Sequence, residues 1–156
     1  SEKIKLDLST DPVLQRRYHD SVSLTRGPLI YSLKVSDSWK RINHDVQGRE
    51  LPHGDWEVHP ESDWQVALKI GTDALLNSMH FEDREVDNIP FSPDSAPVVV
   101  RARGQKISHW HYEHTAAAPP PQSPVDPDAM EGDEVDLTLV PYGCTNLRVT
   151  ELPWYE

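Results

Sequence analysis

The chain has 156 residues, 26 acidic and 15 basic side chains, a formal net charge of −11 and a single cysteine. This length suits one domain with a sizeable hydrophobic core, whereas the negative charge disfavours nucleic acid and anionic membrane surfaces as partners. One cysteine excludes an internal disulfide framework and a multi-cysteine zinc site. No apolar run approaches the roughly 20 residues needed to span a bilayer.

The first half of the chain predicts short strands, one break and a polar loop. Apolar and polar side chains alternate, as in half-buried strands, over residues 4–8, 22–24, 29–35 and 64–70. Arg26, Gly27 and Pro28 interrupt this pattern, and Gly and Pro at such a place predict a bulge or a bend. The stretch 40–63 is polar and contains several glycines and prolines, which predicts a loop.

The second half predicts further strands around a long proline-rich loop. The strand candidates are 80–86, 98–103, 107–114, 135–139 and 147–149. The stretch from Ala116 to Gly132 holds five prolines, which predicts an extended surface loop. Pro141, Tyr142 and Gly143 predict a turn that sets the course of the chain before its last strand.

Many short strands separated by turn signals, without helical periodicity, are typical of an antiparallel β-sandwich. We therefore expect an all-β, jelly-roll-like sandwich with little helix, and one domain over residues 1–156. Gly27 at the break is expected to shape the fold, because glycine adopts backbone angles that are costly for other residues.

The sequence SHWHYEH, residues 108–114, raises the question of a metal site. On a continuous strand, residues two apart share a face, so His109, His111 and Glu113 would lie together and could hold zinc with an open position for water. The alternative is an ordinary surface strand that presents these three side chains to solvent and buries Trp110 and Tyr112 on its other face.

Two other catalytic possibilities rest on single residue types. Pairs of carboxylates, such as Glu57 with Glu61 or Asp55 with Asp63, could act as a glycosidase pair, but no motif fixes their spacing and solvated acidic loops are the favoured explanation. Cys144 could be a nucleophile if a base lowered its pKa, whereas a free cysteine more often packs as a small apolar group.

Five tryptophans suggest a carbohydrate-binding surface, because aromatic rings stack on the apolar faces of sugars. Trp64 lies in a strand pattern and is expected in the core. The candidates for an exposed platform are Trp39, Trp56, Trp110 and Trp154. The alternative is that these rings belong to the core or to a contact between domains.

Several segments together resemble a known group of enzymes. They are residues 18–35, 55–70, 89–110, 118–125 and 139–154, of which RGPLIYSL and LVPYGCTNLRVTELP are the most specific. In this order they resemble the C-terminal β-sandwich region of β-L-arabinofuranosidase-like glycoside hydrolases of family 127 and their uncharacterised relatives. In that pattern Trp110 is a structural element and the neighbouring histidines are incidental.

The resemblance implies a non-catalytic accessory domain of a bacterial-type glycoside hydrolase. Such enzymes carry the catalytic residues on an N-terminal (α/α)₆ barrel, so no catalytic residue, metal ligand or cofactor is carried over to this chain. The expected partner is the barrel of the same parent protein, which would be periplasmic or secreted. A carbohydrate-binding module, a metal-dependent enzyme and a homo-oligomer stay open as alternatives.

Overall fold

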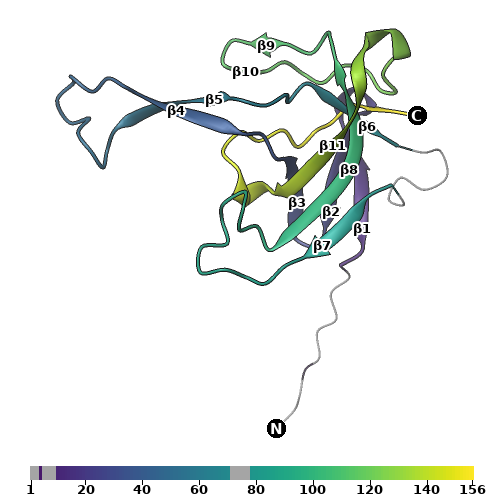
Figure 1. Ribbon diagram of the computed structural model, residues 1–156, viewed down its shortest axis with the longest axis horizontal. Coiled ribbons are helices and arrows are strands. Elements are labelled where there is room, and N and C mark those ends of the chain that lie inside the picture. The colour runs from purple at the N-terminus through teal and green to yellow at the C-terminus, as the bar shows by residue number, and fades with distance from the viewer. Residues whose placement is uncertain (1–3, 5–9, 71–77) are drawn as a thin grey trace.

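The computed structural model describes residues 4, 10–70 and 78–156, and in these residues the chain is all-β (Figure 1). The only helical elements among them are three-residue 3₁₀ turns, η1 (Tyr18–Asp20), η2 (Pro127–Ala129) and η3 (Tyr142–Cys144). No helix in the described part is long and apolar enough to cross a membrane. The strands are β1 (Pro12–Arg16), β2 (Val22–Arg26), β3 (Leu29–Leu33), β4 (Asp37–Ile42), β5 (Asp55–Pro60), β6 (Val66–Lys69), β7 (His80–Asp83), β8 (Val98–Ile107), β9 (Tyr112–Glu113), β10 (Ala116–Ala117), β11 (Met130–Pro141) and β12 (Trp154–Tyr155).

Eight of these strands form one curled sheet. Its order is β1-β2-β3-β11-β8-β6-β12, with β7 also paired to β8. All pairings are antiparallel except that of β12 with β6, which is parallel. The expected all-β, sandwich-like fold with little helix is therefore confirmed.

The core lies on the inner face of this sheet, around its two longest strands. Along β8 and β11, Ala102, Leu137 and Leu139 are buried. Their neighbours point outward, where Arg103 Nη1 lies 2.7 Å from a carboxylate oxygen of Asp136. The alternation read from the sequence thus sets which side of each central strand faces the core.

The expectation that residues 40–63 form a polar loop was wrong. Strands β4 and β5 pair with each other over six residue pairs and form an arm that projects from the body (Figure 1). No residue of β4 or β5 is fully buried. Because the hairpin joins no larger sheet, it lacks the buried apolar face that marks a core strand in a sequence.

Other expectations hold in part. Strand β1 was not expected, and the expected strand at 4–8 lies outside the described residues except for Ile4. The segment 147–149 is no strand, although the Val149 carbonyl accepts a hydrogen bond from Leu33 N (2.9 Å). The proline-rich stretch is not a plain surface loop, because alternate residues in it, including Ser123 and Val125, are buried against the body.

The two expected shape-setting points are both turns. Gly27 and Pro28 join β2 to β3 in a tight hairpin in which Arg26 pairs with Leu29, and Gly27 has a left-handed φ of 55°. The break is therefore a hairpin turn and not a bulge within one strand. After Pro141 ends β11, Tyr142 and Gly143 lie in η3, which confirms the expected turn.

Candidate functional site

The SHWHYEH segment is not one continuous strand. Strand β8 ends at Ile107, and a turn at residues 108–109 separates it from the two-residue strand β9. Trp110 is buried, and its indole Nε1 donates to the carbonyl of Ala118 (2.7 Å). The expected shared face of His109, His111 and Glu113 is therefore not formed.

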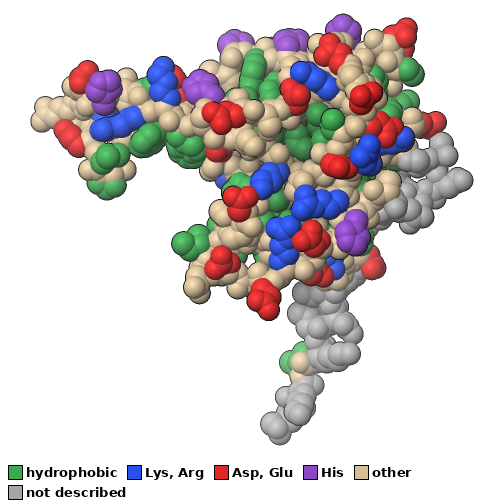
Figure 2. Space-filling model, in the orientation of Figure 1, with side chains coloured by type: hydrophobic (Ala, Val, Ile, Leu, Met, Phe, Trp, Pro, Cys, Tyr) green, Lys and Arg blue, Asp and Glu red, His purple; other side chains and the backbone are tan. Residues whose placement is uncertain are grey.

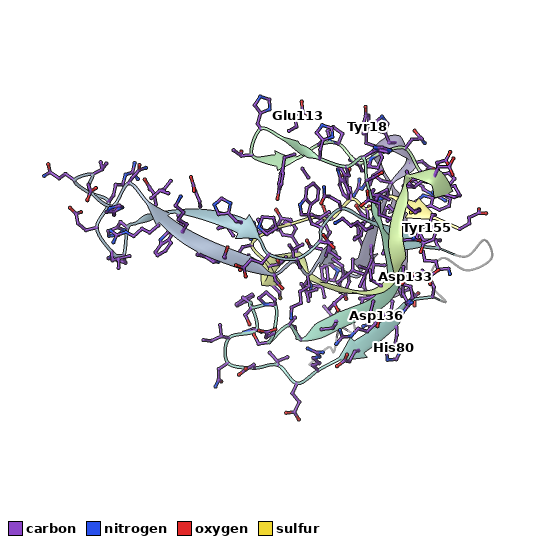
Figure 3. All side chains as sticks on the ribbon, turned by 45° about the horizontal axis from the view of Figure 1, so that its top comes forward. Tyr18, His80, Glu113, Asp133, Asp136 and Tyr155 are labelled. Atoms are coloured by element: carbon purple, nitrogen blue, oxygen red, sulfur yellow. The ribbon has the colours of Figure 1, made fainter. Side chains whose placement is uncertain are left out.

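No metal centre is assembled in the part of the chain that the structure describes. Within residues 4, 10–70 and 78–156, no group of three or more His, Cys, Asp or Glu side chains is placed to hold a metal ion. Glu113 lies on the small β9–β10 hairpin, whereas His80, Asp133 and Asp136 lie on the large sheet (Figure 3). The described acidic and histidine side chains of the large sheet therefore do not complete a site with Glu113.

The tryptophans proposed for a sugar platform divide into two buried and two exposed rings. Trp110 and Trp154 are buried in the core, so the exposed platform was the wrong prediction for them and the alternative, that these rings belong to the core, holds. Trp154 lies under the guanidinium of Arg16, 4.6 Å from the ring centroid. Trp39 and Trp56 are half exposed on the arm. Their ring centroids are 6.2 Å apart and their planes differ by 70°, which is not a single flat platform.

The two sides of the arm carry different types of side chain. Figure 2 shows hydrophobic side chains along its lower edge and histidines with basic side chains along its upper edge. In the register of the hairpin, Trp39 is opposite Val58 and Arg41 is opposite Trp56. Since side chains alternate along a strand, both tryptophans share one face and Glu57 and His59 share the other.

Two of the carboxylates considered as glycosidase pairs, Asp55 and Asp63, bind neighbouring cations or amides instead. Asp55 accepts hydrogen bonds from Asn43 Nδ2 (2.9 Å) and Arg49 Nη1 (3.0 Å), which orders the loop at the end of the arm. Asp63 lies 3.0 Å from Lys106 Nζ, and this hydrogen bond raises the pKa of the lysine. These contacts give Asp55 and Asp63 structural roles.

Cys144 is buried and does not have the setting of a nucleophile. Its Sγ donates to the carbonyl of Pro90 (3.2 Å), and it packs with Ala96, Val99 and Val140. Burial raises the pKa of the Cys144 thiol, which disfavours the reactive thiolate. The contact with Pro90 instead ties the β7–β8 loop to η3.

A groove of about 650 Å³ opens between the base of the arm and the β9–β10 hairpin. Its floor is the segment Asn146–Val149, which precedes β12. Figure 1 shows the arm and the small hairpin on either side of this region. Its lining comprises Val35, Glu57, Val58, His59, Pro60, Trp64, Tyr112, His114, Thr115, Ala116, Ala117, Asn146, Leu147, Arg148 and Val149.

A stack of aromatic rings forms one wall of this groove. The ring centroid of Tyr112 lies 5.0 Å from that of Trp64, and Trp64 meets Trp110 edge-on at 5.2 Å. Trp64 and Trp110 are buried, whereas Tyr112 is 51% exposed. The two tryptophans therefore hold Tyr112 from behind and leave part of its ring open to solvent.

Polar groups line the rest of the groove. His59 Nε2 lies 3.3 Å from a carboxylate oxygen of Glu57 on the β5 side. At the floor, Asn146 Nδ2 donates to Asp37 (3.2 Å), and Arg148 is fixed through its Nε, which donates to the carbonyls of Thr145 (3.0 Å) and Tyr142. The groove thus combines one open aromatic ring with prepositioned hydrogen-bonding groups.

Sequence reasoning missed this groove because its parts are far apart in the chain. Tyr112 was expected to be buried, since a continuous strand over 107–114 would place it beside Trp110; the turn at 108–109 removes that register. No local pattern links Glu57, Tyr112 and Arg148. Comparisons of the chain with protein-family models, with curated proteins and with solved structures gave no match.

Proposed function

We propose that this chain is a non-catalytic accessory domain of a glycoside hydrolase, and that its arm packs against the catalytic domain of the same protein. The observation that carries the docking role is the pair Trp39 and Trp56, 51% and 43% exposed on one face of a projecting hairpin. Tryptophan is the residue most typical of interface hot spots. The assignment to glycoside hydrolases is supported by the resemblance of the sequence segments.

A second exposed apolar group lies on the same side of the body. The loop between β7 and β8 exposes Ile89 and Phe91, 71% and 74%, and both this loop and the arm project toward the left in Figure 1. Burial of such side chains contributes about 25 cal/mol per Å² of apolar area. Together the arm and this loop offer two separated contacts for one larger domain.

The arm is built to keep its shape in such a contact. Its six paired positions and the hydrogen bonds of Asp55 to Asn43 and Arg49 order it before any partner binds. A preordered element loses little conformational entropy on docking, which favours affinity.

The test uses the longer protein that the proposal requires, with Trp39→Ser and Trp56→Ser combined. We expect the catalytic domain to melt at a lower temperature in this variant, while the isolated 156-residue chain keeps its own melting temperature because both rings are half exposed. Tyr18→Ser, which removes another exposed ring, is the matched control. An unchanged melting temperature of the catalytic domain contradicts docking through the arm, and hydrolysis of aryl glycosides by the isolated chain contradicts the non-catalytic role.

A further inference from the structure

We propose that the groove between the base of the arm and the β9–β10 hairpin binds a neutral saccharide, with Tyr112 as the stacking ring. This inference does not rest on the docking proposed above, because neither Trp39 nor Trp56 lines the groove. It also differs from the platform expected from the sequence, since none of the four predicted tryptophans lines the groove.

The aromatic wall fits the apolar face of a sugar ring. Tyr112 lines the groove with half of its surface exposed, and Trp64 supports it at 5.0 Å. Trp64 is in turn held by Trp110, whose indole is anchored to Ala118. A ring fixed in this way stacks on a ligand at a low cost in conformational entropy.

The polar lining fits the hydroxyl groups of a sugar ring. Glu57 supplies a carboxylate acceptor, His59 supplies an imidazole, and Asn146 supplies an amide that both donates and accepts. Arg148 is held through its Nε by two backbone carbonyls, so its position is set before a ligand arrives. Groups with fixed positions on β5 and on the segment Asn146–Val149 select a ligand by the directions of its hydroxyls.

The charge of the lining favours a neutral ligand. The groove contains one carboxylate, Glu57, and one guanidinium, Arg148, so its formal charges balance when the histidines are neutral. A phosphate or a uronic acid would meet Glu57 inside the groove and a chain of net charge −11 around it. The volume of about 650 Å³ lies within the range of small-ligand pockets, roughly 300–1,000 Å³.

The test is calorimetric titration of the 156-residue chain with xylohexaose, cellohexaose, mannohexaose and arabinan oligosaccharides, with oligogalacturonate as the anionic comparison. We expect at least one neutral oligosaccharide to bind and Tyr112→Ala to weaken that binding by about tenfold or more, because stacking is lost. Tyr112→Phe keeps the ring and is expected to stay within about threefold of the wild type.

Tyr18→Ala is the matched control, because Tyr18 is an exposed tyrosine stacked on His19 outside the groove. Its affinity for the same oligosaccharide is expected to equal that of the wild type. The proposal is overturned if no neutral oligosaccharide in the set binds, if only oligogalacturonate binds, or if Tyr112→Ala binds as well as Tyr18→Ala.

Discussion

Val22 and Leu152 exchange backbone hydrogen bonds in both directions, with N–O distances of 2.8 and 2.9 Å. Val22 lies at the start of β2, whereas Leu152 lies two residues before β12, at the far edge of the same sheet. This pair therefore connects two distant parts of the curled sheet. Both side chains are buried in the core.

Leu152→Ala is expected to lower the free energy of unfolding by about 2–5 kcal/mol, because it leaves a cavity where a buried leucine stood. Urea denaturation of both proteins measures the difference. Leu51→Ala is the control: Leu51 is 63% exposed on the arm, and loss of its side chain should change the free energy of unfolding by less than about 0.5 kcal/mol. Equal stability of Leu152→Ala and wild type would show that burial of the Leu152 side chain contributes little.

Gly104→Ala is expected to destabilise the protein by about 2 kcal/mol or more. Gly104 lies in the middle of β8, opposite Val135 of β11 and Leu68 of β6. A Cβ there would overlap the side chain of Leu137 and the backbone carbonyl of Ala67, and a carbonyl within a ladder moves only if the sheet shifts. Gly143→Ala, with no atom within 4 Å of the added carbon, should melt like the wild type in the same thermal scan.

Gly27→Val is expected to lower the melting temperature by several degrees. Gly27 has a φ of 55° in the β2–β3 turn, and a left-handed backbone costs most other residues about 1–2 kcal/mol. Gly27→Asn is the graded control, because asparagine tolerates this conformation better than valine does. If the two variants melt together at the wild-type temperature, the turn does not require glycine.

Glu134→Gln is expected to make the stability less sensitive to acid. A hydrogen bond from Lys69, and then the charges of Lys69 and Arg103, lower the pKa of Glu134 in the folded protein. The pKa of Glu134 is therefore lower in the folded than in the unfolded protein. The ionised Glu134 stabilises the fold at pH values above the unfolded pKa, and this stabilisation is lost as the pH falls through the folded pKa. The glutamine variant has no carboxylate at this position, so it does not lose stability in this way.

The measurement is urea denaturation at several pH values from neutral down to about 3, near and below the unperturbed pKa of glutamate. Glu113→Gln removes another exposed carboxylate that has no ion pair among the described residues. Its slope of stability against pH is the comparison for the loss of a carboxylate without an ion pair, and a slope in Glu134→Gln equal to that of the wild type would rule out a net contribution from the contact with Lys69.

The strands that sequence patterns located contribute buried apolar residues to the core. Leu137 and Leu139 alternate with less buried residues on β11, whereas β2 and β6 also bury the residues between their apolar positions, Ser23 and Ala67. The sequence did not predict the strands of the arm, because β4 and β5 are exposed on both faces and show no apolar alternation. Its tryptophans were correctly expected to be exposed, whereas Trp154 is buried through contacts with residues far away in the chain, among them Leu68 and Asp20.

By itself, the sequence determined the all-β class, the break in the strand pattern at Gly27 and the inner faces of the central strands, because these follow from local backbone preference and side-chain alternation. Only the tertiary structure decided that Trp110 is buried while Tyr112 is half exposed, since a turn at 108–109 breaks the strand between β8 and β9. It also decided that Glu57, Tyr112 and Arg148 line one groove. Such contacts depend on how distant segments pack, which no local sequence period encodes.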